Sequence, residues 1–167
     1  NLLKLTELAT SLGLSAGFYS NNCHCSDHSS TCKIDGGGLC TAGDVNLVVE
    51  SGFTSLKVDS CGTEKNISLF AELLNESGTP VLLENCHEGS PTRRSDGSVK
   101  CDMNLFRTSS DIRPTYGSIV TNLLTVDAYN AAGLTGPGCW AYPGALALHA
   151  HTHTHTHTHT HTICIQL

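Results

Sequence analysis

The sequence has no excess of basic residues, no long apolar run and no glycine motif for a dinucleotide. Nine Lys and Arg stand against 15 Asp and Glu, a net charge of -6, so no positive field attracts nucleic acid. No stretch approaches the roughly 18 consecutive apolar residues of a membrane span. No G-x-G-x-x-G follows a predicted strand, and the glycines at 36–38 open no predicted helix. We therefore expect a soluble protein that binds neither nucleic acid nor a dinucleotide.

Cysteine, in contrast, is abundant, with nine among 167 residues. Two glycosylation sequons, Asn66-Ile-Ser68 and Asn75-Glu-Ser77, accompany them. Together they predict a disulfide-bonded glycoprotein of the secretory pathway, either secreted or lysosomal or vacuolar. The length suffices for one domain with a core. Because the chain begins at Asn1 without a signal peptide, we expect preceding sequence to be missing.

Helical and strand patterns alternate along the chain. Apolar residues recur at helical spacing in four segments, three of which stop near Gly13, Gly52 and Gly78. The predicted helices are 2–12, 42–51, 64–77 and 115–131, and the predicted strands are 14–19, 55–59, 80–84 and 104–108. Such alternation predicts an α/β fold with a parallel sheet, either doubly wound or closed into a barrel.

The run Leu56-Lys-Val-Asp-Ser-Cys61 has the period of a strand, with Leu56 and Val58 on one face and Lys57 and Asp59 on the other. Charged side chains inside a parallel sheet are costly unless they are paired or face a cavity. In a barrel, the carboxyl ends of strands line the active site. A surface ion pair on an edge strand is the alternative interpretation.

A second carboxylate, Asp111, follows the predicted strand 104–108 and lies four residues after Arg107. At the ends of two strands of one sheet, Asp59 and Asp111 would face one pocket. Retaining glycoside hydrolases need such a pair, one ionised as nucleophile and one protonated as acid/base. Because Lys57 would favour the ionised form of its neighbour, we assign the nucleophile to Asp59 and the acid/base to Asp111.

These motifs resemble successive blocks of the melibiase-type α-galactosidases, in a divergent eukaryotic branch. The likeness covers about 1–143 in the right order. It rests on Gly17-Phe-Tyr-Ser-Asn-Asn-Cys23, the run from Leu56 to Cys61, Glu84-Asn-Cys-His87, Arg107 with Asp111, Ile112-Arg-Pro-Thr-Tyr-Gly117 and Gly136-Pro-Gly-Cys-Trp-Ala-Tyr-Pro143. The resemblance implies a partial (β/α)8 TIM barrel comprising strands three to six and the start of the seventh, with 1–143 as a partial catalytic domain.

The resemblance also implies roles. The family's nucleophile and acid/base fall on Asp59 and Asp111, and no cofactor or metal is expected. The implied substrate-binding residues are Tyr19, Lys57, His87, Arg107 and Trp140. His87 stands where the family usually has a sugar-contacting Glu, and Gly144 stands where it has an Asp. The preference between α-galactosides and α-N-acetylgalactosaminides therefore stays open.

Disulfide pairs are implied by the same resemblance. Cys61 should bond to Cys23 or Cys25, and Cys86 should bond to Cys101. Cys32 and Cys40 could pair with each other, while Cys139 and Cys164 are expected to be unpaired. A zinc site at Cys23-His24-Cys25 with Cys32 is the alternative, which lacks the usual two-residue spacer. A Cys86–His87 nucleophile pair is disfavoured because neighbouring strand residues point to opposite faces.

Within the tail from 144 to 167, the run from His149 to Thr162 alternates His and Thr almost without interruption, and seven of the ten His lie between His149 and His161. A translated CA dinucleotide repeat gives this pattern. An intron beginning with GT inside an Asp codon would read as Gly144, so we expect a retained intron and a non-native tail. The alternative is a multidentate site for Zn, Ni or Cu.

Two function classes follow. The first is a retaining hydrolase that removes terminal α-galactosyl residues from oligosaccharides or glycoconjugates, of which this chain is the middle part. The second is a non-catalytic carbohydrate-binding or degenerate barrel protein. Part of a barrel has open edge strands. We therefore expect the chain alone to be inactive and of low stability.

Overall fold

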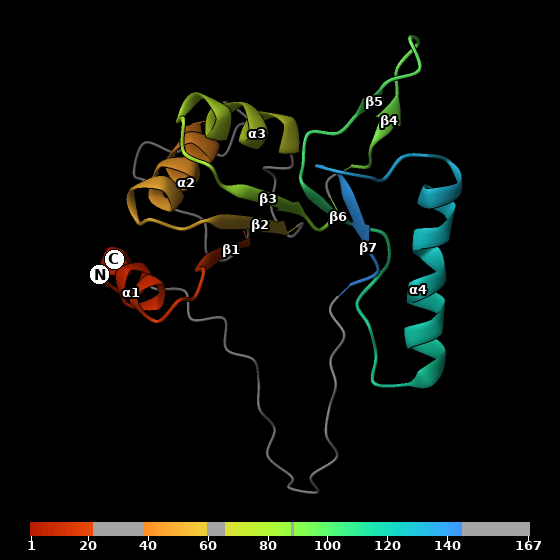
Figure 1. Cartoon of the computed structure of the whole chain (residues 1–167), viewed down its shortest axis with the longest axis horizontal. Helices are drawn as coiled ribbons and strands as arrows, with labels where there is room; N and C mark the ends of the chain where they lie inside the picture. Colours follow the sequence, from red (N-terminus) through yellow and green to blue (C-terminus); the bar gives the residue numbers. More distant parts are fainter. Residues whose placement is uncertain (22–38, 60–65, 88, 145–167) are drawn as a thin grey trace, which may run out of the picture.

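A computed structural model describes 1–21, 39–59, 66–87 and 89–144. Helices and strands alternate along these residues, as the periodicity predicted (Figure 1). In chain order the elements are α1 (Leu2–Ser11), β1 (Gly17–Asn21), α2 (Leu39–Glu50), β2 (Ser55–Asp59), α3 (Ile67–Glu76), β3 (Leu82–Asn85), β4 (Thr92–Arg93), β5 (Val99–Lys100), β6 (Leu105–Arg107), α4 (Tyr116–Ala131) and β7 (Trp140–Tyr142).

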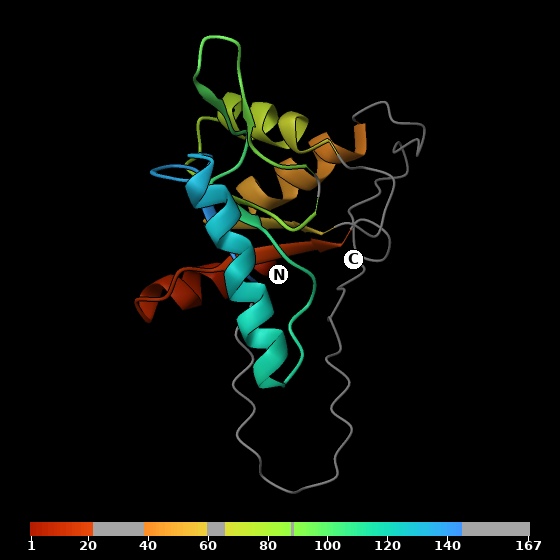
Figure 2. The same cartoon turned by 90° about the vertical axis from the view of Figure 1, so that its right-hand side faces the viewer.

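Five of the strands form one parallel sheet in the order β1-β2-β3-β6-β7. Helices α2 and α3 pack together on one face of the sheet (Figure 1). Helix α4 packs along β7 and lies nearest the viewer in Figure 2. The predicted α/β architecture is confirmed. Among the described residues, no helix is long and apolar enough to cross a bilayer.

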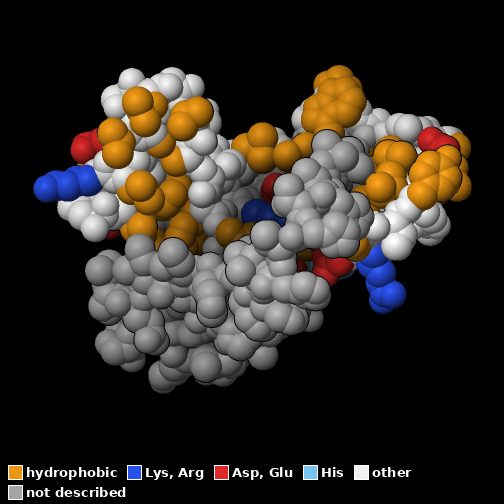
Figure 3. All heavy atoms as spheres, turned by 90° about the horizontal axis from the view of Figure 1, so that it is seen from below, with side chains coloured by type: hydrophobic (Ala, Val, Ile, Leu, Met, Phe, Trp, Pro, Cys, Tyr) orange, Lys and Arg blue, Asp and Glu red, His pale blue; other side chains and the backbone are white. Residues whose placement is uncertain are grey.

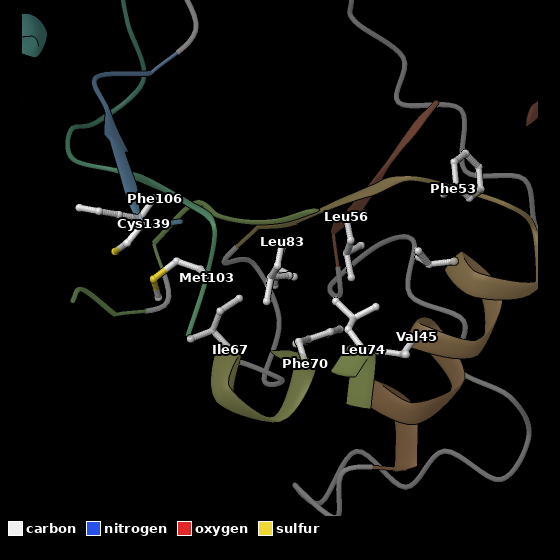
Figure 4. Close-up of a cluster of buried hydrophobic side chains, with 12 residues drawn as sticks. Val45, Phe53, Leu56, Ile67, Phe70, Leu74, Leu83, Met103, Phe106 and Cys139 are labelled. Carbon is white, nitrogen blue, oxygen red and sulfur yellow. The ribbon is translucent and has the colours of Figure 1, made fainter. Parts of the chain in front are cut away.

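The core lies between the sheet and helices α2 and α3 (Figure 4). The strands contribute Leu56, Val58, Leu83 and Phe106, which face Val48 and Phe70 among other side chains of the helices. Burying each large apolar side chain stabilises the fold by about 1.5–3 kcal/mol. Since Leu56 and Val58 turn into this core, Lys57 and Asp59 must lie on the opposite face of β2.

The helix ends have local causes. Asn66 caps α3, its side-chain oxygen accepting from the backbone N–H of Leu69 at 3.1 Å, so α3 begins at Ile67. Gly52 and Gly78 follow α2 and α3 with φ of 71° and 67°, a left-handed conformation that suits glycine. The predicted helix stops at these glycines are therefore confirmed.

The hairpin β4–β5 was not predicted. Its strands have two residues each, too few for a recognisable alternation. A turn joins them, in which Asp96 Oδ1 accepts from the backbone N–H of Ser98 at 2.9 Å and Gly97 has a φ of 85°. The hydrogen bonds from Ser98 lower the pKa of Asp96.

Two cysteine predictions are wrong. Cys101 is bonded to Cys139, with a Cα–Cα distance of 6.1 Å, and Cys86 is a buried free thiol. The parallel topology explains the difference, because Cys101 and Cys139 precede β6 and β7 at the amino edge of the sheet. Cys86 follows β3 at the opposite, carboxyl edge, so Cys139 rather than Cys86 is within reach of Cys101.

The remaining disulfide predictions lie outside the described residues. The bond from Cys61 to Cys23 or Cys25 falls there, as does Cys32, the possible partner of Cys40. The His-Thr tail from residue 145 on falls there too.

Candidate active site

Polar side chains gather on the face of the sheet opposite the core. The register aligns Tyr19 with Lys57 and Lys57 with Glu84 across β1, β2 and β3. Two residues further on, Asp59 ends β2 and Arg107 ends β6. Because the strands are parallel, these ends meet at one edge. A space-filling view shows a few basic and acidic side chains between hydrophobic ones (Figure 3).

Asp59 is held by its neighbours on both sides. The Tyr19 hydroxyl donates a hydrogen bond to Asp59 Oδ2. His87 Nδ1 lies 3.8 Å from Asp59 Oδ1, close enough for an ion pair when the imidazole is protonated. These contacts fix the orientation of a carboxylate at the end of a buried strand.

Arg107 connects the second carboxylate, Asp111, to His87 and so to Asp59. Its Nη1 donates to Asp111 Oδ1 at 2.6 Å, and its Nη2 lies 3.2 Å from His87 Nδ1 and also contacts Nε2. The Arg107 side chain is 8% exposed and that of Asp111 is 90% exposed. Contacts therefore run from Tyr19 through Asp59, His87 and Arg107 to Asp111, which brings five of the predicted site residues together.

A second network of polar contacts joins Lys57, Glu84 and Tyr142 on the same face of the sheet. Lys57 Nζ is 3.5 Å from Glu84 Oε1, and the Tyr142 hydroxyl donates to the same oxygen. Lys57 also lies 5.5 Å from the centre of the Tyr19 ring. Burial, together with the Glu84 carboxylate, raises the pKa of Tyr142. Glu84 and Tyr142 were given no role in the sequence analysis, although a charged residue ending a predicted buried strand is the signal that singled out Asp59.

Trp140 lies apart from these networks. It starts β7, is half exposed, and donates its backbone N–H to the Asn104 carbonyl at 2.8 Å. Within the part of the chain that the structure describes, no hydrogen bond or ring contact joins its side chain to the other candidates. The structure thus does not bring Trp140 to the Asp59 group.

A pocket of about 710 Å³ opens beside the group, toward α4. Such a volume suits a small ligand. Asp111 lines the pocket, whereas Asp59 does not. The lining includes Cys86, His87, Arg107, Asp111, Asn122 and Thr125.

Gly144 borders the same region. A Cβ placed on Gly144 would lie 3.6 Å from Arg107 Cδ. Arg107 Nε is buried and has no hydrogen-bond partner among the described residues. Position 144, where the resemblance implies an Asp, therefore lies next to a guanidinium nitrogen that lacks an acceptor among the described residues.

Cys86 and His87 lie closer together than strand alternation suggested. Strand β3 ends at Asn85, so the two residues after it need not point to opposite faces. The Cys86 sulfur, a His87 ring nitrogen and an Asp59 oxygen lie within 4.8 Å of one another. Burial raises the pKa of the Cys86 thiol to about 11. The positive charge of Arg107 lowers this pKa and the negative charge of Asp59 raises it, but burial has the largest effect. A thiol with so high a pKa is a poor nucleophile at neutral pH, which disfavours a Cys/His catalytic pair on other grounds.

Comparison with solved structures gives similar chains. An α-galactosidase from Saccharomyces cerevisiae matches with a TM-score of 0.63 and 17% identity, over 92% of this chain and 39% of that one. A GH27 β-L-arabinopyranosidase from Geobacillus stearothermophilus matches with 0.57 and 17%, over 84% and 41%. α-Galactosidase I from Mortierella vinacea matches with 0.55 and 19%, over 89% and 43%.

The chain spans about two fifths of the length of these structures. No protein-family model matches it, and no curated protein sequence does. At such low identity the likeness concerns the fold, and in this respect the resemblance predicted from the motifs is confirmed. The chain therefore has the fold of part of the TIM barrel of GH27 glycoside hydrolases.

Proposed function

We propose that this chain is the middle part of a retaining glycoside hydrolase that removes terminal α-galactosyl residues from oligosaccharides or glycoconjugates. The observation that carries the proposal is the pair of carboxylates, Asp59 and Asp111, connected through His87 and Arg107 at the carboxyl edge of a parallel sheet. In barrels of this kind that edge carries the catalytic residues.

In the proposed reaction Asp59 attacks the anomeric carbon and forms a covalent glycosyl intermediate, while Asp111 protonates the leaving oxygen. Water then attacks the anomeric carbon while Asp111, now ionised, takes up its proton, and the bond between the sugar and Asp59 breaks. The Tyr19 hydrogen bond directs the Asp59 carboxylate. Asp111 is ion-paired with Arg107, so this pair has to open before Asp111 can act as an acid.

The same residues supply donors for sugar hydroxyls. Lys57 and Arg107 are candidates to bind the galactosyl unit, with His87 at its rim and Tyr19 as an aromatic surface. Glu84 holds Lys57 in place and thereby adds a positioning residue to this set. A secretory location, either extracellular or lysosomal or vacuolar, fits the two sequons. Both asparagines are exposed on or beside α3.

The test is the hydrolysis of an α-galactoside by the longest natural form of the protein that contains this chain. We expect Asp59→Asn and Asp111→Asn each to lower kcat by about 10²-fold to 10⁴-fold. Asp127→Asn, at an exposed position on α4, serves as the matched control and should leave the rate unchanged. NMR of the first-formed sugar should show the α anomer if configuration is retained.

Unchanged rates in Asp59→Asn and Asp111→Asn would remove the catalytic assignment. If the unmodified protein binds galactosides but does not turn them over, the non-catalytic barrel becomes the better description. Binding is measured by calorimetry with galactose and with N-acetylgalactosamine, which also resolves the preference left open by His87.

A further inference from the structure

Three side chains of metal-binding type meet at the carboxyl edge of the sheet. The Asp59 oxygen, the Cys86 sulfur and the His87 ring nitrogen come from the ends of two adjacent strands and lie within 4.8 Å of one another. The backbone fixes two of them, because the Cys86 N–H donates to the Val58 carbonyl at 3.0 Å. Asp59 and Cys86 are thus held side by side by the sheet itself.

We propose that Asp59, Cys86 and His87 bind a zinc ion. Zinc accepts carboxylate, thiolate and imidazole together, and three protein ligands leave a fourth tetrahedral position for water. Usual zinc bond lengths place the ligand atoms about 3.5 Å apart. His87 Nδ1 is already 3.8 Å from Asp59 Oδ1, and the exposed His87 side chain can supply the remaining closure.

The neighbouring positive charge of Arg107 limits the affinity of this site for zinc. Arg107 Nη2 lies 3.2 Å from His87 Nδ1, so the ion has to displace the guanidinium from the imidazole. Asp111 retains Arg107 on its other side at 2.6 Å. Cys86 binds as a thiolate, so its proton passes to solvent when the sulfur–zinc bond forms. Displacing Arg107 and deprotonating Cys86 both weaken zinc binding, so the ion binds reversibly.

The consequence rests on the proposed function. A zinc ion on Asp59 would occupy the carboxylate that we propose as the nucleophile, and zinc would inhibit hydrolysis. Binding itself requires no activity, so the two proposals can fail separately.

The experiment is a titration of the intact chain with Co²⁺, which replaces zinc and gives a thiolate-to-metal charge-transfer band only when a cysteine binds it. We expect this band in the unmodified protein and its disappearance on addition of Zn²⁺. Cys86→Ser should abolish the band, and His87→Ala should weaken binding by at least about tenfold, as a perturbed metal site does.

Cys164→Ser is the matched control, because it removes a cysteine next to the His-Thr tail and should keep the band. Imidazoles of the tail can bind Co²⁺ but give no thiolate band. The proposal is overturned if the unmodified protein shows no band, or if Cys86→Ser shows the same band as the unmodified protein. If Cys86→Ser does not fold, as judged by circular dichroism, then unchanged binding in His87→Ala overturns the proposal.

Discussion

At the scale of single residues, Cys86 makes stability depend on pH. Burial raises the pKa of its thiol from 9.0 to about 11 in the folded chain. As pH rises between these values, the unfolded state releases the proton first, so the free energy of unfolding decreases. We expect urea denaturation to show this decrease from about pH 9 to about pH 11. Cys86→Ala should lessen this decrease, and the part that remains comes from Tyr142, whose pKa is also raised. An unchanged slope would contradict the explanation.

Several residues of the site could be predicted from sequence because β2 shows its two faces in its own alternation. Lys57 and Asp59 are charged where Leu56 and Val58 are apolar. Glu84 and Tyr142 were missed because the hydrogen bond between them joins residues 58 apart in sequence. The Cys101–Cys139 bond was missed because sequence spacing does not say which edge of the sheet a cysteine occupies.

At the scale of elements, two glycines test the conformations at helix ends. Gly52 has a φ of 71°, and an added Cβ would lie 3.2 Å from Thr6 Oγ1. Gly117, in α4, has open space around its Cβ position. We expect Gly52→Ala to destabilise the chain by about 1 kcal/mol or more, and Gly117→Ala to stabilise it by roughly 0.4–1 kcal/mol. Chemical denaturation of both variants measures the difference. Equal effects would show that backbone conformation does not decide these positions.

The longer elements could be predicted because their patterns run over two or more turns. Helices α1 and α4 agree with the predicted segments to within a residue or two. Helix α2 begins at Leu39, three residues before its predicted start, because the valines that mark its apolar face begin only at Val45, in its second turn. The hairpin β4–β5 depends on a turn rather than on periodicity.

At the scale of the whole molecule, the Cys101–Cys139 bond ties together segments 38 residues apart. It joins the chain before β6 to the chain before β7, with α4 between them. We expect Cys139→Ser to lower the free energy of unfolding by about 2–4 kcal/mol. Because both cysteines serve one bond, Cys101→Ser/Cys139→Ser should cost about as much as the single change. Additive losses in urea denaturation would argue against the bond.

The sheet order leaves β1 and β7 each with one strand neighbour among the described residues. Open edges of this kind favour association. We expect the 167-residue chain alone to show no α-galactoside turnover and to sediment as mixed oligomers. A monomeric species with measurable activity in analytical ultracentrifugation and enzyme assays would contradict this expectation.

The two faces of β2 also separate the effects of mutation on folding from its effects on the candidate active site. Substitutions at Leu56 or Val58 act on the core, whereas substitutions at Lys57 or Asp59 act on the opposite face. A lineage could therefore exchange the chemistry of this strand, or lose it altogether, while keeping a chain that still folds. Under relaxed selection the polar positions would drift first, so Lys57 and Asp59 would be lost before Leu56 and Val58.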